Sequence, residues 1–275
     1  AYWDDGAQVL APHDKGIIEE VNKISSASEI KFEGNKELIQ VIGKEIDDEY
    51  LRQVHTISID PEVIKRQKDL KIVYTPIHGT GMMLIPQSLK LWGFENVHCV
   101  PEQMVKSGDF PTVVSPNPEN AEALSMAIDL AKKLDADIVM ASDPDADRVG
   151  IAMKCPDGSY ELVSGNEVGV LLLDYICAGR IEKGTMPEKA VAVKSIVSTP
   201  LADAVAEHYG VELRNVLTGF KWIGDQIANL EAAGEVDRFI FGFEESYGYL
   251  AGPYVRDKDA VIGSMLICEM AAYYR

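Results

Sequence analysis

The chain has 275 residues, and its 44 acidic residues outnumber 26 basic residues to give a formal net charge of −18. So negative a charge argues against nucleic acid and anionic membranes as partners, because both demand basic patches on a protein. No run of about 18 apolar residues occurs, so the sequence predicts no transmembrane helix, and no signal peptide is visible. The length suffices for roughly two globular domains.

Residues 1–38 predict only a small piece of structure. A strand beginning at Tyr2 and a turn at 4–6 precede a short helix at 15–24. This segment is too small to bury a core of its own. The chain begins at Ala1 without a methionine, inside the predicted strand, so we expect it to be a piece of a longer protein.

Residues 39–160 predict an α/β domain. Asp60 followed by Pro61 is typical of a helix N-cap. The predicted helices are 45–55, 61–69, 83–92 and one that is capped by Asn117 and ends near 134, and the predicted strands are 70–75, 96–100, 138–141 and 149–153. Alternation of strands and helices is typical of a doubly wound unit, in which ligands gather at the carboxyl ends of the strands.

Residues 161–275 repeat this alternation. Thr199 before Pro200 predicts another helix N-cap, and Asp259 suits the N-cap of the last helix. The predicted strands are 190–196, 211–216 and 238–243, and the predicted helices are 166–178, 199–209, 222–230 and 259–274. We therefore expect an α/β fold of two consecutive doubly wound domains with mixed sheets, preceded by a short N-terminal remnant of a further domain.

The four cysteines form neither a metal site nor a redox motif in the sequence. None lies in a CxxC pair, and none combines with histidines at zinc spacing. They are Cys99, Cys155, Cys177 and Cys268. The sequence therefore predicts reduced thiols in a cytoplasmic protein.

Three carboxylates stand at alternate positions between two apolar segments that predict strands. They are Asp143, Asp145 and Asp147, and Arg148 follows at once. Alternate side chains of an extended loop share one face, where like charges repel unless a cation lies among them. Carboxylate oxygens favour a hard divalent cation, Mg²⁺ first. A solvated acidic turn is the other interpretation.

An EF-hand is excluded for this loop, because its sixth and twelfth positions hold Arg148 and Lys154 where glycine and glutamate are required. The arginine needs its own explanation. A permanent cation beside a metal cluster suits an anionic ligand that both share, and phosphate is the best candidate.

Four further residue groups are candidates for chemistry, and each has a plainer alternative. The glycine-bearing turn at 75–81 exposes N–H groups that suit phosphate, or it is an ordinary tight turn. Lys221 begins a helix, where its positive charge opposes the helix macrodipole. This placement indicates a ligand unless the lysine is simply solvated. Glu244 and Ser246 suit vicinal hydroxyls of a sugar or belong to a polar turn. Lys258 lies in a charged stretch that a solvated turn also explains.

The sequence DPDADR at 143–148 resembles the metal-binding loop of the α-D-phosphohexomutase superfamily, which comprises the phosphoglucomutases and phosphomannomutases. The resemblance implies that Asp143, Asp145 and Asp147 hold Mg²⁺ and that the metal touches an oxygen of a phosphoserine. It also implies that Arg148 lies beside that phosphoryl group.

Three more stretches resemble motifs of the same superfamily, in the same order. The turn TPIHGTG implies that His78 is catalytic, as a proton shuttle or a hydrogen-bond donor. The stretch at 218–221 implies that Thr218 and Gly219 bind substrate and that Lys221 is a substrate ligand and a candidate general acid or base. The charged stretch before the last helix places Lys258 near the transferring phosphoryl group.

The loop at 243–247 resembles the sugar-binding loop of the superfamily, so Glu244 and Ser246 would bind the sugar 3- and 4-hydroxyls. Phe243 and Tyr247 replace the two glycines of the GEMSG sequence found in members with dual glucose and mannose specificity. This loop is instead similar to the phosphoglucomutase and phosphopentomutase branch.

The resemblance implies an enzyme that interconverts hexose 1-phosphate and 6-phosphate through a phosphoserine and a bisphosphorylated sugar. Glucose 1-phosphate, glucose 6-phosphate and glucose 1,6-bisphosphate are the expected partners. The catalytic serine loop and the phosphate-clamp loop are absent, and Ser115 does not match the serine loop. We therefore expect this chain to be inactive alone.

Two alternatives stay open at this point, and the oligomeric state is not indicated by the sequence. The first is a phosphopentomutase. The second is a metal-dependent sugar-phosphate binding module without enzymatic activity. A phosphoglucosamine mutase fits less well, because its sugar loop differs.

Overall fold

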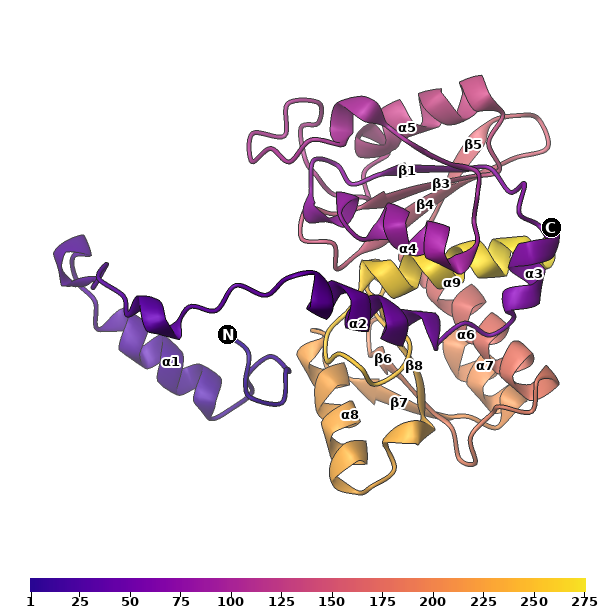
Figure 1. Ribbon diagram of the computed structural model, residues 1–275. Helices are drawn as coiled ribbons and strands as arrows, with labels where there is room; N and C mark the ends of the chain where they lie inside the picture. Colours follow the sequence, from indigo (N-terminus) through magenta and orange to yellow (C-terminus); the bar gives the residue numbers. More distant parts are fainter.

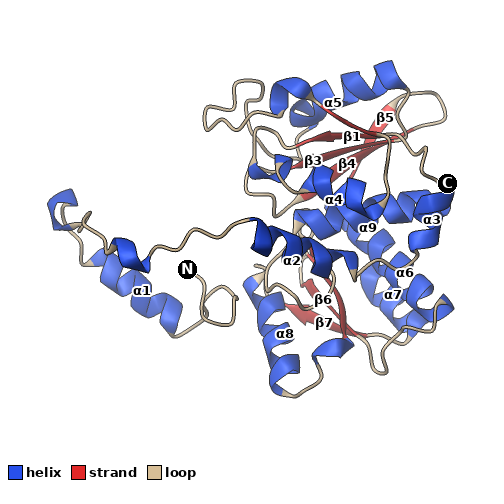
Figure 2. Cartoon of the chain, viewed as in Figure 1, coloured by secondary structure: helices blue, strands red, loops and turns tan.

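The computed structural model describes residues 1–275 as two α/β units and an N-terminal extension. Figure 1 shows the two units above and below helix α9 (Ala260–Tyr274), with the extension reaching out to one side. Figure 2 shows helices flanking a sheet in each unit. The predicted α/β fold with two mixed sheets is confirmed.

The first unit is built on a five-stranded sheet in the order β2-β1-β3-β4-β5. The strands are β1 (Ile72–Thr75), β2 (Val97–Cys99), β3 (Ile138–Ser142), β4 (Val149–Lys154) and β5 (Tyr160–Val163). β1 pairs in parallel with β2 and β3, whereas β4 runs antiparallel to both β3 and β5. The acidic loop therefore joins two antiparallel neighbours at the carboxyl end of β3.

The helices of the first unit begin close to their predicted positions, with one exception. They are α2 (Lys44–His55), α3 (Pro61–Arg66), α4 (Ile85–Trp92) and α5 (Ala121–Leu134). Asp60 caps α3 as predicted, because its side chain accepts from the Glu62 N–H. The prediction that Asn117 caps α5 is wrong: Asn117 accepts from the Glu119 N–H and closes a turn ahead of the helix instead.

The second unit has a four-stranded sheet in the order β7-β6-β8-β9. Its strands are β6 (Val191–Ser195), β7 (Glu212–Val216), β8 (Phe239–Phe243) and β9 (Tyr249–Leu250), and its helices are α6 (Gly165–Glu182), α7 (Leu201–Tyr209) and α8 (Lys221–Ala232) together with α9. β6 pairs in parallel with β7 and β8, and β9 is antiparallel to β8.

The two sheets divide at Ser164. The expected boundary between residues 160 and 161 falls inside β5, which continues to pair with β4 as far as Val163. Ser164 and Glu167 then form a capping box that begins α6. The last strand of the first sheet thus leads into the first helix of the second unit without a linker.

Helix α9 belongs to both units. It is buried along nearly its whole length and contacts α3 and α4 on one side and α6 and β9 on the other. A helix that is apolar all round is typical of such a core position. The buried carboxylate of Glu269 accepts hydrogen bonds from the Tyr175 hydroxyl and from the N–H groups of Ile59 and Asp60. One hydrophobic core therefore runs through both units.

The N-terminal extension contains helix α1 (His13–Asn22), close to the predicted helix. The predicted strand at Tyr2 is wrong, because this segment forms only an isolated bridge between Tyr2 and Gln8. A strand needs a neighbour to supply its hydrogen bonds, and no strand of either sheet lies beside this segment. None of the helices combines the length and the apolar character that crossing a membrane requires.

Candidate active site

The three carboxylates of the acidic loop form one cluster. Asp143, Asp145 and Asp147 each offer an oxygen, and these oxygens lie within 4.8 Å of one another. Asp143 is buried, Asp147 is half-buried and Asp145 is exposed, so the cluster opens to solvent on one side. An all-oxygen set at this spacing fits a hard divalent cation such as Mg²⁺.

Asp143 also shapes the loop. One of its carboxylate oxygens accepts from the N–H groups of Asp147 at 3.1 Å and Arg148 at 3.0 Å, and the other accepts from Arg148 Nε at 2.7 Å. Burial raises the pKa of Asp143, although hydrogen bonds from Arg148 oppose the shift. Burial, followed by the charge of Asp143, raises the pKa of Asp145. The negative charges of this cluster are therefore only partly compensated within the protein.

The guanidinium of Arg148 is partly exposed. Its side chain is 30% exposed, and Nη1 forms an ion pair with a Glu119 oxygen at 3.6 Å, longer than a hydrogen bond. The contact of Nε with Asp143 holds the planar group at one edge. The other edge can donate two parallel hydrogen bonds to a phosphate beside the carboxylate cluster.

The glycine-bearing turn at 75–81 packs directly on the acidic loop. The N–H and hydroxyl of Thr80 donate to the Pro144 carbonyl oxygen at 2.8 and 3.1 Å. A Cβ at Gly79 would lie 2.4 Å from the Cα of Pro144, so only glycine fits there. The structure thus brings this turn and the carboxylates together, as the strand-end argument predicts.

The ring of His78 is not part of this cluster. His78 is 3% exposed and has a left-handed backbone with φ of 63°. Its Nδ1 lies 2.9 Å from the Val105 carbonyl oxygen and its Nε2 lies 2.8 Å from the Thr112 hydroxyl oxygen. Because a carbonyl only accepts, Nδ1 carries a proton, and in the neutral ring Nε2 then accepts from the Thr112 hydroxyl. Both ring nitrogens are therefore engaged by the neighbouring loop.

Lys258 links the second unit to the acidic loop. Its Nζ lies 2.7 Å from a carboxylate oxygen of Asp147 and 3.3 Å from one of Asp257. Burial alone would lower the pKa of Lys258, but the hydrogen bond to Asp147 and the charge of Asp257 outweigh it and raise the pKa. The ammonium group is therefore held in its charged form. The next residue, Asp259, caps α9 as predicted.

Backbone hydrogen bonds join the same two regions. The N–H of Ala260, at the start of α9, donates to the Ala146 carbonyl oxygen at 3.1 Å, and the N–H of Val149 donates to the Tyr247 carbonyl oxygen at 3.1 Å. The acidic loop of the first unit is thus fixed against the β8–β9 loop and the start of α9 in the second.

Two of the predicted sugar-binding residues contact each other. Glu244 is 5% exposed, and its carboxylate accepts from the Gly219 N–H at 2.7 Å. Gly219 has φ of 113°, which favours glycine. Burial raises the pKa of Glu244. Thr218 is exposed beside Gly219, and Ser246 is half-buried on the Glu244 loop.

Lys221 begins α8 as predicted, with its side chain 30% exposed. Its Nζ lies 3.7 Å from a carboxylate oxygen of Asp14 in α1 and 5.4 Å from the centre of the Trp222 ring. The N-terminal extension contacts the second unit again at Asp257, whose carboxylate accepts from Gln8 at 2.7 Å.

A comparison with protein families matches residues 48–158 to phosphoglucomutase/phosphomannomutase alpha/beta/alpha domain II and residues 164–275 to domain III. The chain belongs to the phosphoglucomutase/phosphomannomutase family. This result confirms the resemblance that the five motifs indicate. The two matched ranges lie on either side of β5, and the second begins at Ser164, where the two sheets divide.

Curated relatives of the family are about a third identical to this chain over the aligned residues. The phosphoglucomutase of Staphylococcus haemolyticus is 36% identical over 94% of this chain and 46% of its own length. The chain therefore spans about half the length of the curated relatives it matches.

Solved structures in this family share the fold. A phosphomannomutase structure from Thermus thermophilus, described as putative, has a TM-score of 0.65 at 23% identity, covering 83% of this chain and 47% of the other. The Aspergillus fumigatus N-acetylphosphoglucosamine mutase in complex with GlcNAc-6P and magnesium has a TM-score of 0.50 at 15% identity, covering 78% of this chain and 50% of the other.

Sequence reasoning did not single out Asp257 and Glu119, which lie beside Lys258 and Arg148 in the structure. Asp257 lies between the basic residues Arg256 and Lys258. A search of the sequence for acidic partners of Lys258 could therefore have found it. Glu119 is distant in sequence from Arg148, and its proximity depends on the packing of the segment before α5.

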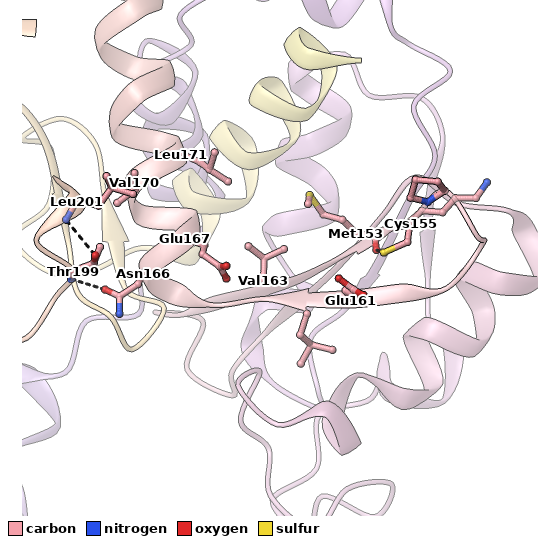
Figure 3. Close-up of a pocket in the computed structure, with 13 residues that line it drawn as sticks. Met153, Cys155, Glu161, Val163, Asn166, Glu167, Val170, Leu171, Thr199 and Leu201 are labelled. Atoms are coloured by element: carbon pink, nitrogen blue, oxygen red, sulfur yellow. Dashed lines mark hydrogen bonds between the residues drawn. The ribbon is translucent and has the colours of Figure 1, made fainter. Parts of the chain in front are cut away.

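The cavity nearest the acidic loop holds about 400 Å³ and is lined by residues that include Tyr50, Thr80, Asp145 and Asp259. A larger cavity, of about 540 Å³, lies elsewhere, between the β4–β5 hairpin and the starts of α6 and α7. Figure 3 shows Met153, Val163 and Leu201 among its lining residues. None of the predicted site residues lines this larger cavity, so volume alone does not identify the site.

Proposed function

We propose that the protein to which this chain belongs is a Mg²⁺-dependent phosphohexomutase that interconverts hexose 1-phosphate and hexose 6-phosphate through a phosphoserine and a bisphosphorylated sugar. The observation that carries this proposal is the contact of the acidic loop with the second unit. The N–H of Val149 donates to the Tyr247 carbonyl oxygen of the β8–β9 loop at 3.1 Å, and Lys258, just before α9, lies 2.7 Å from Asp147. The relatives named phosphoglucomutase support the same activity.

The carboxylates of Asp143, Asp145 and Asp147 would hold the Mg²⁺ ion. The magnesium in the Aspergillus fumigatus mutase complex supports this choice of metal. When bound, the ion supplies positive charge to phosphoryl oxygens. Arg148 donates from its free edge to the same phosphoryl group and disperses the negative charge that builds up as the group moves.

Lys258 contributes charge beside this phosphoryl group. Burial lowers the pKa of Lys258, but the hydrogen bond to Asp147 outweighs burial and raises it, which favours the charged ammonium form. His78 supports the turn that carries Gly79 and does not contact the substrate. Both of its ring nitrogens are occupied by contacts with Val105 and Thr112. Lys221 stays a candidate for donating a proton or for binding the far phosphate of the sugar.

Glu244 and Ser246 would bind two neighbouring sugar hydroxyls. The Glu244 carboxylate is already held by the Gly219 N–H, which leaves its second oxygen to accept from a hydroxyl. The partly exposed Ser246 hydroxyl can both donate and accept. With Thr218 and Gly219 beside them, these residues form the sugar side of the site, and the acidic loop forms the phosphoryl side.

Residues 1–38 would be the end of the domain that carries the catalytic serine, and the chain alone would be inactive. A coupled assay with glucose 1-phosphate should show turnover by the full-length protein and none by these 275 residues. No turnover by the full-length protein with any hexose phosphate would contradict the proposal. Robust turnover by the chain alone would contradict the proposal that this chain is inactive without the rest of the protein.

The β8–β9 loop keeps phosphopentomutase activity as a second candidate. Tyr247 has a left-handed backbone, with φ of 67°, at a position where dual-specificity members carry glycine. Its side chain restricts the loop in a way that glycine would not. A comparison of rates with glucose 1-phosphate and ribose 1-phosphate in the full-length protein separates the two activities.

A further inference from the structure

The loop between β8 and β9 carries three polar residues in a row, and the two glutamates point in different directions. Glu244 contacts Gly219 on the substrate side of the loop. Glu245 turns back into the second unit, where one carboxylate oxygen accepts from the Ser195 hydroxyl at 2.8 Å and from the Ser198 hydroxyl at 3.2 Å. Glu245 is therefore anchored to the carboxyl end of β6.

This anchor is rigid. Ser195 and Ser198 are 0% and 3% exposed, and their hydroxyl oxygens lie 2.8 Å apart. Lys194, also 3% exposed, has its Nζ 3.3 Å from the Ser198 carbonyl oxygen and 3.3 Å from a carboxylate oxygen of Asp203 in α7. Buried polar groups whose hydrogen bonds are made in this way specify one arrangement of their side chains. Any other arrangement would leave a buried donor or acceptor without a partner.

The backbone of Glu245 lies against the first residue of α6. A Cβ at Gly165 would be 2.1 Å from the Glu245 carbonyl oxygen and 2.9 Å from the Tyr247 nitrogen. On its other side the loop is joined to β4 through the hydrogen bond from Val149 to Tyr247. The backbone of the loop is thus confined, and Glu245 is the side chain that ties its centre to the sheet.

We propose that Glu245 is a positioning residue, which fixes the orientation of Glu244 and Ser246 toward the sugar through its hydrogen bonds with Ser195 and Ser198. It does not touch the substrate itself. This inference deepens the proposed function and rests on it, since it assigns the selectivity of the sugar side of the site to a buried contact behind the loop.

The test uses the full-length protein and three variants, Glu245→Ala, Glu245→Gln and Ser195→Ala. Glutamine keeps a carbonyl oxygen that can accept from both hydroxyls. Alanine removes that acceptor, and of the two buried hydroxyls, which lie 2.8 Å apart, only one can then donate to the other. We expect Glu245→Ala to raise KM for glucose 1-phosphate about tenfold or more with a smaller change in kcat. Glu245→Gln should stay within about threefold of the wild type, and Ser195→Ala should lie between them.

Mn²⁺ affinity, measured by calorimetry on the same variants, separates positioning from general damage, because the carboxylate cluster lies on a different loop. Unchanged Mn²⁺ binding beside a raised KM supports the proposal. Ser195→Ala provides the same test if Glu245→Ala does not fold. A KM within about twofold of the wild type for Glu245→Ala, or equal losses of Mn²⁺ binding and substrate binding, would overturn it.

The same assay separates the two proposals. A wild-type protein that turns over glucose 1-phosphate, together with a Glu245→Ala variant that behaves like it, overturns only the positioning role. A wild-type protein without mutase activity overturns the proposed function and this inference with it.

Discussion

The Nζ atom of Lys258 lies 2.7 Å from a carboxylate oxygen of Asp147, although the two residues lie on loops of different α/β units. The lysine side chain is only 17% exposed, so water screens this pair weakly. The contact joins the metal-binding loop of the first unit to the segment just before α9 in the second unit. It therefore connects the stability of the domain interface to the geometry of the candidate site.

Lys258→Met should destabilise the chain by about 2 kcal/mol, because it leaves the carboxylates of Asp147 and Asp257 without their cation in a half-buried setting. Chemical denaturation of the 275-residue chain measures this change. Lys65→Met is the matched control, since the pair of Lys65 with Glu62 is largely exposed and its loss should be within error. Equal effects of both substitutions would contradict a special role for the interface pair.

Asp145→Asn should weaken Mn²⁺ binding by about tenfold or more, because it removes one charged oxygen from the carboxylate cluster. A calorimetric titration with Mn²⁺ as a surrogate for Mg²⁺ checks this on the chain and on the full-length protein. Asp129→Asn, at an exposed position of α5, controls for the loss of one negative charge. Similar weakening in both variants would mean that the ion responds only to net charge.

The metal-free chain should lose stability as pH rises through the carboxyl range. Burial raises the pKa of Asp143 and of Asp145 above their usual values. When the pKa of a carboxyl group is higher in the folded state than in the unfolded state, the protonated group stabilises the folded state. This stabilisation is complete below the unfolded-state pKa of about 4, and it is lost as pH rises through the folded-state pKa.

Mg²⁺ should reverse the loss, because it binds the ionised carboxylates of the folded state only. Thermal melts at pH 4 and pH 7, each with and without Mg²⁺, provide the measurement. We expect Mg²⁺ to raise Tm at the higher pH and to have little effect at the lower one. A Tm that Mg²⁺ leaves unchanged at both values would contradict the predicted metal site.

Gly79→Ala should both destabilise the chain, by about 2 kcal/mol, and weaken Mn²⁺ binding. The added Cβ would lie 2.4 Å from the Cα of Pro144, and backbone atoms cannot move aside as a flexible side chain can. Gly34→Ala is the control, because no atom lies within 4 Å of the added Cβ there. Denaturation and calorimetry on the same samples show whether the acidic loop has shifted.

Arg148→Lys should lower kcat of the full-length protein by about a hundredfold, because lysine cannot donate two parallel hydrogen bonds to a phosphoryl group. His78→Gln should have a much smaller effect on kcat, since the ring of His78 contacts Val105 and Thr112 and not the carboxylate cluster. Steady-state kinetics measures both. A larger loss for His78→Gln than for Arg148→Lys would restore His78 as a catalytic candidate.

The sequence alone determined those features that depend on neighbouring residues. Alternate carboxylates on a loop between two apolar strands indicated one cluster, and the structure places their oxygens within 4.8 Å. Asp60 and Asp259 are N-caps because a short acidic side chain before a helix satisfies N–H groups that have no partner in the helix. Local hydrogen bonding and the period of the apolar residues suffice for inferences of this kind.

Only the tertiary structure decided which distant groups meet. The ring of His78 is held by Val105 and Thr112, which lie 27 and 34 residues further along the chain. Helix α9 packs against both units. Its sequence is apolar on every side and therefore does not indicate which neighbours cover each face of the helix. The meeting of Lys258 with Asp147 depends in the same way on how two sheets pack about one core, and that packing is a sum of many contacts distant in sequence.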